Sequence, residues 1–303
     1  MAEVKNLQSP SGSPLTDFGF YFTGLDGCEA TARAIDFLLE KFPARDRWCV
    51  EFGAGSDPHG STTDRLIAGQ NYSAVLIEGV ADGCEKLRRH YAGRPQVTVF
   101  EKFVSFDPRN EDRLDGILSR TPIPVDFDFL SVDIDGNDYH AWDAVKHYRP
   151  KLVMVEFNPT MPPDLDFVQP ADPSLNIGNS LAALVRLAKS KGYELTAVLG
   201  VNVFFVRADF FPLMGVADNS IRALWTQRDC VTHLFCGYDG RLHLAGCKKL
   251  PWHYSLPMEE SKLQVLPRFL QKYAFKQNDK RVYETLKNPL WPVKRLLARL
   301  GGR

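Results

Sequence analysis

Short apolar runs alternate with segments of helical periodicity over residues 28 to 206. The apolar runs are WCVEFG, SAVLIEG, QVTVFEKFV, DFDFLSVDIDG, KLVMVEFN, ELTAVLG and NVFFVRADFF. Between them lie EATARAIDFLLEKF, TTDRLIAG, ADGCEKLRRHYAG, NDYHAWDAVKHY and SLAALVRLAKSKG, which predict helices. Strands that are apolar throughout and separated by helices indicate a mostly parallel sheet covered on both faces. The chain therefore predicts an α/β fold with a doubly wound, seven-stranded sheet.

The end of this pattern predicts a change of strand direction and then a change of domain. The last two apolar runs follow each other closely, so the last strand is expected to be antiparallel. Beyond residue 215, HLFCGYDGRLHLAG predicts a β-hairpin with Asp239 and Gly240 in its turn, and MEESKLQVLPRFLQKYAF predicts a helix. We expect a flexible leader over 1–17, a main domain over 18–215 and a small C-terminal extension over 216–303.

Composition excludes several classes of function. The 303 residues carry 37 Lys and Arg against 37 Asp and Glu, so no overall positive field indicates a nucleic-acid partner. No apolar run approaches the roughly 20 residues of a transmembrane helix, and the N-terminus lacks the apolar core of a secretory signal. Six scattered cysteines are typical of a reduced, cytoplasmic protein.

The C-terminal end is basic and amphipathic from Lys287 onward. Such a segment allows peripheral contact with an anionic membrane surface. Docking of a C-terminal helix on the domain, or a solvated end, is the commoner explanation.

The stretch VEFGAGSDPHGST, residues 50–62, has the position of a ligand-binding loop. Open α/β sheets bind ligands outside the carboxyl ends of their strands. Gly53 and Gly55 let the backbone turn tightly and approach a ligand, although conformation alone also explains two glycines in such a turn. Glu51 places a carboxylate at the strand end. Glu78 ends the second strand, where a carboxylate can accept hydrogen bonds from ribose hydroxyls.

These features fit a dinucleotide or S-adenosylmethionine (SAM), and the loop favours SAM. A dinucleotide needs a third glycine and a helix N-terminus free to receive pyrophosphate. Here the third position is Pro58, and Asp57 adds negative charge. An acidic loop suits SAM better, because its sulfonium and ammonium groups are cationic.

Two further stretches carry a resemblance to a known family. DFDFLSVDIDGNDYHAW, residues 126–142, and KLVMVEFNPTMPP, residues 151–163, resemble the FkbM-like branch of class I SAM-dependent methyltransferases. VEFGA, VLIEG and the ending GYEL…N-x-FFVR agree with relatives of that branch over about residues 45–215. Relatives tend to have an acidic residue and a glycine soon after the first glycine, whereas this chain reads Gly-Ser-Asp-Pro-His-Gly. The resemblance implies a Rossmann-like methyltransferase domain.

The resemblance also implies a cofactor site. Glu51, Gly53 and Gly55 would contact the methionine end of SAM, and Glu78 would bind the ribose. The chain from Glu101 to Phe103 would border the adenine, and Asp133 would lie near the sulfonium and the acceptor.

Three interpretations of the acidic segment after the fourth strand stay open. Asp133 or Asp135 could act as the acceptor-side base, with or without His140. Asp133, Asp135 and Glu156 could instead chelate a hard divalent cation such as Mg²⁺. In the third interpretation, the segment from Asp135 to Asp138 is a turn and N-cap for the next helix.

We therefore expect a SAM-dependent methyltransferase that methylates an oxygen of a small molecule or sugar. One alternative is a SAM- or sugar-binding module that has lost catalysis. Another is a metal-dependent enzyme of the same fold that uses no methyl donor. The loop Asn158–Pro163, together with Asn176–Ser180, forms either a substrate lid or a structured crossover.

Overall fold

The computed structural model describes residues 27–55, 61–107 and 109–288. The chain divides into two compact units, Met1–Arg228 and Asp229–Arg303. This division falls after Arg228, whereas the sequence boundary was placed after residue 215. The leader over 1–17 and the basic tail beyond Asn288 lie outside the described residues. Among the residues described, no helix is long and apolar enough to cross a membrane.

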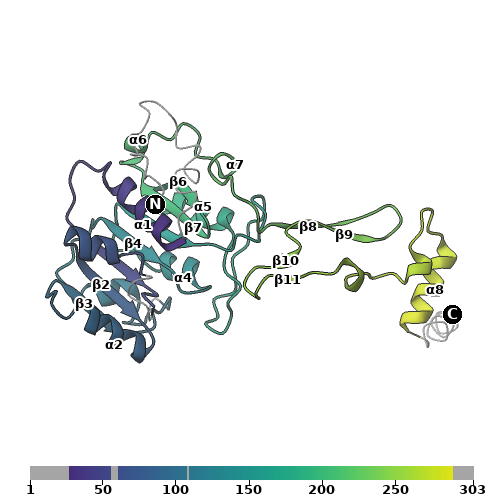
Figure 1. The fold of residues 1–303 in the computed structure, drawn as a ribbon, viewed down its shortest axis with the longest axis horizontal. Coiled ribbons are helices and arrows are strands. Elements are labelled where there is room, and N and C mark those ends of the chain that lie inside the picture. The colour runs from purple at the N-terminus through teal and green to yellow at the C-terminus, as the bar shows by residue number, and fades with distance from the viewer. Residues whose placement is uncertain (1–26, 56–60, 108, 289–303) are drawn as a thin grey trace, which may run out of the picture. The chain divides into compact units, whose positions relative to one another are not determined.

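The first unit is built on one seven-stranded sheet in the order β3-β2-β1-β4-β5-β7-β6 (Figure 1). The strands are β1 Trp48–Phe52, β2 Ser73–Glu78, β3 Val97–Glu101, β4 Phe129–Val132, β5 Leu152–Glu156, β6 Tyr193–Leu199 and β7 Asn202–Arg207. β1 to β5 pair in parallel, and β7 is antiparallel to both β5 and β6. The predicted doubly wound, Rossmann-like sheet with an antiparallel last strand is confirmed.

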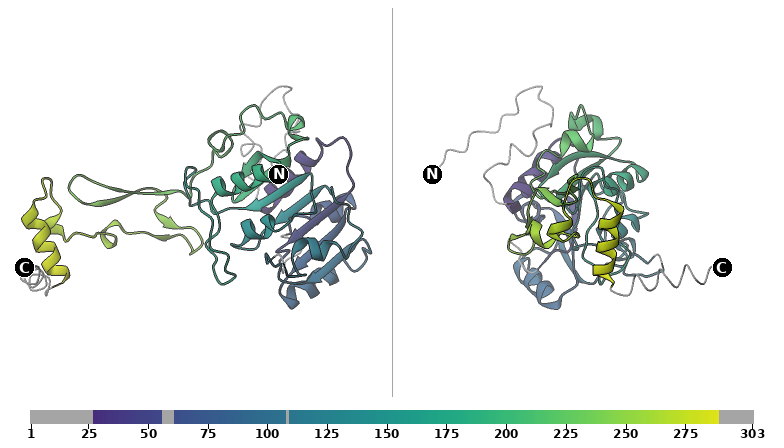
Figure 2. Two further views of the ribbon diagram at one scale, coloured as in Figure 1. Left: turned by 180° about the vertical axis from the view of Figure 1, so that it is seen from behind. Right: turned by 90° about the vertical axis from the view of Figure 1, so that its right-hand side faces the viewer.

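The helices of this unit cover both faces of the sheet (Figure 2). Their bounds are α1 Gly27–Leu39, α2 Ala81–His90, α3 Leu114–Leu118, α4 Asp138–Asp143, α5 Leu181–Ser190, α6 Phe211–Met214 and α7 Ile221–Leu224. Successive side chains of β7 point to opposite faces of the sheet and so contact the two helical layers. Phe204 belongs to the core cluster under α1, whereas the ring of Phe205 stacks on Trp142 of α4 at 5.2 Å. TTDRLIAG, predicted as a helix, forms a π-helical turn, η3 Arg65–Gly69.

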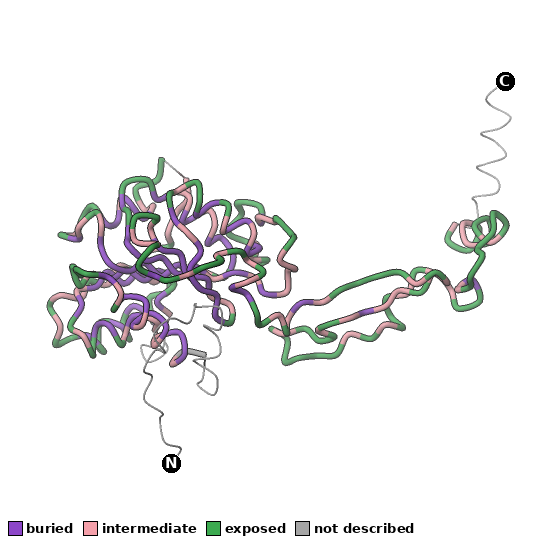
Figure 3. Tube along the Cα trace, turned by 90° about the horizontal axis from the view of Figure 1, so that it is seen from above, coloured by how far each residue is buried: buried purple, intermediate pink, exposed green. Residues whose placement is uncertain are grey.

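The second unit is made of small elements. β8 Thr232–Cys236 and β9 Leu242–Gly246 pair antiparallel, which confirms the predicted hairpin. β10 Lys249–Leu250 and β11 Leu256–Pro257 form a second, shorter hairpin. Many residues of this unit are exposed, whereas most strands of the first unit's sheet are buried and only the edge strand β3 is partly exposed (Figure 3).

The helix predicted over residues 258–275 is wrong. This segment holds only the 3₁₀ turns η4 Glu260–Lys262 and η5 Arg268–Leu270, and the helix α8 Gln277–Lys287 follows it. Pro267 lacks the N–H that a helix interior needs. The side chain of Gln264 also ties the segment to β9, since it accepts from the N–H of Leu242 and donates to its carbonyl. Pairing to the hairpin therefore replaces local helix.

Candidate functional site

The register of the sheet brings the predicted site residues into one row at its carboxyl edge. Phe52 pairs with Ile77 and Val132, Val132 with Val155, Glu78 with Glu101, and Glu156 with Asn202. One step beyond Phe52 and Val132, the row consists of Glu101, Glu78, Gly53, Asp133, Glu156 and Asn202. We call it the carboxyl-edge row. The strand order reverses between β1 and β4, so the row crosses the switch point at which such sheets bind ligands.

Gly53 lies at the junction of the two halves of this row. Its φ is +76°, and a Cβ there would lie 1.5 Å from the carbonyl oxygen of Asp133. Only glycine lets β1 and β4 approach this closely. Gly55 also has a positive φ, +70°, but a Cβ there would meet no atom within 4 Å. Asp57 and Pro58, which favour SAM over a dinucleotide, lie outside the described residues.

Glu51 is buried and its carboxylate is used within the protein. It accepts from the hydroxyls of Thr63 (2.5 Å), Ser61 (2.6 Å) and Thr62 (2.8 Å). It also accepts from the N–H groups of Thr62 and Thr63 at 3.0 and 3.3 Å. Five donors fill the acceptor capacity of one carboxylate. Glu51 therefore fixes the chain on the far side of the loop. The run of three hydroxyl residues, Ser61 to Thr63, was the sequence signal for this role, and sequence reasoning missed it.

Glu78 lies between the glycine loop and the start of α2. Its carboxylate accepts from the N–H of Gly55 at 2.9 Å and from the N–H of Val80 at 2.8 Å. A Cβ on Gly83 would lie 2.9 Å from Cγ of Glu78, so that glycine lets α2 pack closely on this side chain. The structure thus brings Glu78 and Gly55, two predicted cofactor residues, into direct contact.

The third strand contributes an ion pair and an open aromatic ring. Glu101 pairs with Arg88 of α2 at 3.6 Å. The ring of Phe103 lies over Gly79, where a Cβ would be 2.2 Å from the ring. Phe103 is nevertheless 77% exposed. A large exposed ring next to the chain that follows Glu78 is suited to stacking on a flat ligand.

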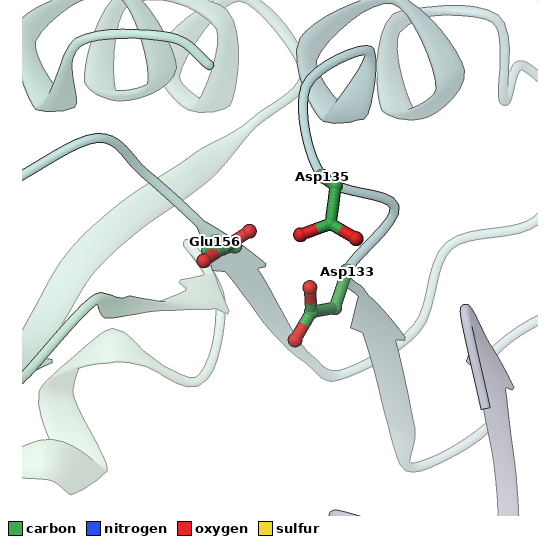
Figure 4. A group of neighbouring side chains, drawn as sticks. All are labelled: Asp133, Asp135 and Glu156. Carbon is green, nitrogen blue, oxygen red and sulfur yellow. The ribbon is translucent and has the colours of Figure 1, made fainter. Parts of the chain in front are cut away.

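Asp133, Asp135 and Glu156 point toward one another at the ends of β4 and β5 (Figure 4). One carboxylate oxygen of each lies within 4.8 Å of the others. Asp133 and Glu156 face one another closely enough for one carboxyl group, when protonated, to donate to the other. Burial, and next the neighbouring carboxylates, raise the pKa of Glu156 and of Asp133 above their ordinary values. The pair is therefore arranged to hold a proton between two carboxylates, while Asp135 is exposed at its edge.

Asp138 holds the turn that presents Asp135. Its buried carboxylate accepts from the N–H groups of Ile134 (2.8 Å) and Gly136 (2.9 Å). Burial raises the pKa of Asp138 to about 7, although these backbone donors oppose the shift. Asp135 itself has a φ of +56°, which is strained for a residue with a side chain. The turn part of the third interpretation is confirmed, whereas the N-cap of α4 is Asn137, which makes no side-chain capping hydrogen bond.

His140 is not brought into the acidic group. Its Nε2–H donates to the carbonyl oxygen of Gln169 at 2.8 Å. Its ring lies beside Phe106 and Tyr139, at centroid distances of 5.6 and 5.5 Å. A role for His140 as a base together with Asp133 or Asp135 has no direct contact to support it.

Residues 158–180 form a hydrogen-bonded crossover fixed to the turn after β4. Buried Gln169 accepts from the N–H groups of Ile177 and Gly178 at 2.9 and 3.0 Å. Asn179 donates to the carbonyl of Gly136 at 2.8 Å and accepts from the N–H of Gln169 at 3.1 Å. Sequence reasoning missed Gln169 because no recognisable motif links it to its hydrogen-bond partners, which lie eight to ten residues away in the sequence.

Comparisons with known proteins give structural likenesses only. No protein-family model matches the chain, and no curated protein matches it. A search of solved structures finds the CMeT domain of the citrinin polyketide synthase, with 10% identity and a TM-score of 0.40 over 60% of this chain and 52% of that domain. The CurJ carbon methyltransferase matches with 12% identity and a TM-score of 0.39, over 64% of this chain and 58% of that one.

In a third solved structure, the match includes a larger share of that protein's own chain. A SAM-dependent methyltransferase from Aquifex aeolicus matches with 12% identity and a TM-score of 0.35, over 57% of this chain and 89% of that one. The chain thus spans about half the length of the first relative and most of the third. None of these likenesses assigns a family or an activity to this chain.

Proposed function

We propose that this protein is a SAM-dependent methyltransferase that methylates an oxygen of a small molecule or sugar. The carboxyl-edge row is the observation that carries the proposal. It sets a carboxylate suited to ribose, Glu78, on one side of Gly53, and a proton-holding pair, Asp133 and Glu156, on the other side. A cofactor and an acceptor bound across Gly53 would meet at the switch point of the sheet. The FkbM-like resemblance over residues 45–215 agrees with this proposal.

The half of the row on β1, β2 and β3 would bind SAM. The ribose hydroxyls of the cofactor would donate to Glu78, which already accepts from the N–H groups of Gly55 and Val80. The exposed ring of Phe103 offers a stacking surface for adenine. Glu51 would act through the loop that it fixes, since its carboxylate already accepts five hydrogen bonds.

The half on β4 and β5 would serve the acceptor. In the transfer, the acceptor oxygen forms a bond to the methyl carbon, the carbon–sulfur bond breaks and S-adenosylhomocysteine leaves. The hydroxyl proton moves to the carboxylate of Asp133. A raised carboxyl pKa matches a base to neutral conditions.

The same three carboxylates fit a hard divalent cation. Asp133, Asp135 and Glu156 supply only oxygen ligands, which Mg²⁺ prefers, and a cation would relieve the repulsion that raises the pKa values there. When bound, such a cation would lower the pKa of an acceptor hydroxyl. The residues that would hold it are those three.

The proposal is tested by transfer of an isotope-labelled methyl group from SAM to a panel of sugars and hydroxylated small molecules. We expect transfer by the full chain, and its loss in Asp133→Asn. Repetition with EDTA and with added Mg²⁺ tests the cation. SAM binding without transfer to any acceptor would instead indicate a binding module. Cation-dependent turnover of a substrate without SAM would indicate the metal enzyme, and either outcome would overturn the proposal.

A further inference from the structure

The β10–β11 hairpin of the second unit carries a cluster of exposed aromatic and aliphatic side chains. Between its short strands the chain reads Pro-Trp-His-Tyr-Ser, residues 251–255. Trp252 is 55% exposed and Tyr254 is fully exposed, and Leu250 and Leu256 on the paired strands are exposed as well. Four large apolar side chains thus gather at the tip of one small hairpin. Exposed apolar clusters of this kind indicate an interaction surface.

The backbone of the tip is strained for the residues that occupy it. Tyr254 and Ser255 have φ values of +50° and +55°. The left-handed conformation is unfavourable for residues with side chains, and glycine or asparagine adopts it more readily. The turn is closed by hydrogen bonds from the N–H of His253 to Leu250 and from the N–H of Leu256 to His253. The fold therefore tolerates strain to present a fully exposed tyrosine.

The charged residues next to the tip, within residues 248–262, sum to +1, and the sequence of the wider unit is basic. Residues 250–258 contain no carboxylate, and Lys249 at its base has no ion pair among the residues the structure describes. The nearest acidic residues, Glu259 and Glu260, pair with Lys262 and Lys248 at 2.8 and 3.0 Å. The unit Asp229–Arg303 has 14 Lys and Arg against 6 Asp and Glu, a net charge of +8 in a chain whose total is zero.

We infer that the β10–β11 hairpin is an insertion tip for the surface of a membrane that contains anionic phospholipids. Tryptophan and tyrosine prefer the boundary between headgroups and acyl chains, where one end of the ring is apolar and the other wet. The two leucines add apolar area. Lys249 at the base of the hairpin and the net positive charge of the unit complement anionic headgroups. Aliphatic residues favour lipid over single-stranded nucleic acid, which stacks on aromatic rings alone.

The test is sedimentation of the full chain with vesicles of phosphatidylcholine, with and without phosphatidylserine. We expect binding only when phosphatidylserine is present. The double variant Trp252→Ala/Tyr254→Ala should weaken it by about tenfold or more. Tyr238→Ala is the matched control, because Tyr238 is 97% exposed in the same unit but lies next to Asp239, and it should bind as the wild type does.

Circular dichroism of each variant checks that the hairpin changes leave the fold intact. Lys249→Glu should reduce binding to phosphatidylserine vesicles, whereas Lys280→Glu on α8 should reduce it less. Absence of vesicle binding by the wild type would overturn the inference, and so would equal binding by the double variant. Self-association or oligonucleotide binding that the double variant abolishes would assign the tip to another partner and would also overturn it.

Discussion

The carboxylates at the edge of the sheet form two groups that differ in their hydrogen-bond donors. Glu51 and Glu78, on β1 and β2, accept from backbone N–H groups, and Glu51 accepts from three hydroxyls as well. Asp133 and Glu156, on β4 and β5, face one another instead, and no backbone or hydroxyl donor among the described residues reaches their carboxylates.

The two groups of carboxylates at the carboxyl edge of the sheet are therefore suited to different tasks. Donors that fill a carboxylate fix the chain around it, which suits a preformed binding loop. A buried carboxylate without such donors is stabilised by a proton, a cation or a ligand. In the function that we propose, the side of the row on β1 and β2 holds the cofactor in place, and the side on β4 and β5 exchanges a proton.

The first prediction concerns Gly53, where the two groups meet. Gly53→Ala should lower the free energy of unfolding by about 3–5 kcal/mol, because its Cβ would overlap the carbonyl oxygen of Asp133. Gly55→Ala has the same positive φ but open space, so it should cost only about 1 kcal/mol. Urea unfolding of both variants measures the difference. Equal losses would show that the close approach of β1 and β4 is not required.

The second prediction removes the proposed base. Asp133→Asn should reduce methyl transfer by about 100-fold or more, since a general base contributes that much, while SAM affinity changes little. Asp143→Asn, an exposed carboxylate at the end of α4, should leave transfer unchanged. Labelled-methyl assays and calorimetry measure the two properties separately. A variant that loses SAM affinity and transfer together would contradict the assignment of Asp133 to the acceptor side.

The third prediction concerns pH. The folded protein raises the pKa of Glu156, so the native state holds its proton at pH values where the unfolded chain has lost it. The native state binds more protons, so this contribution to stability is complete below the ordinary glutamate pKa and is lost as pH rises toward the raised one. Glu156→Gln should remove this loss of stability at high pH, and should raise the free energy of unfolding by about 1–2 kcal/mol at alkaline pH.

Urea unfolding across a pH series, without divalent cations, measures how the free energy of unfolding changes with pH. Glu85→Gln on the exposed face of α2 is the matched control and should retain the wild-type slope. A Glu156→Gln series parallel to that of the wild type would show that the pair does not hold a proton.

The smallest effect, on the affinity for SAM, is expected at the exposed ring of Phe103. Phe103→Ala should weaken SAM binding by about fivefold, because it removes the ring proposed to stack on adenine. Leu213→Ala, which removes an exposed side chain on α6, should leave the affinity unchanged. Calorimetry measures both. Unchanged affinity in Phe103→Ala would place the adenine elsewhere.

Six of the seven strands of the first unit could be predicted because they are largely buried and read as continuous apolar runs, and the partly exposed edge strand β3 was found from its run of valine and phenylalanine. The same logic placed Gly53, Glu78, Asp133 and Glu156 at strand ends, since each directly follows or closes such a run. The order of strands and the contact of Gly53 with Asp133 could not be predicted, because they depend on pairing between segments about 80 residues apart.

The remaining differences come from long-range hydrogen bonds. Gln169 bonds to His140 and Asn179, and Gln264 bonds to Leu242, with no pattern nearby in the sequence. Such tertiary contacts can override local periodicity, which is why the helix predicted over 258–275 does not form. The cofactor, catalytic and metal-binding roles of all the predicted site residues stay predictions.

The most direct test of the central claim, that the carboxyl-edge row binds SAM, is a calorimetric titration of SAM into the full chain with and without Mg²⁺. We expect binding that Glu78→Gln weakens by about tenfold or more, because a charged acceptor for the ribose hydroxyls is lost, and that Glu85→Gln leaves unchanged. A Glu78→Gln variant that binds as the wild type does, or a wild-type protein that binds no SAM in either condition, would contradict the account.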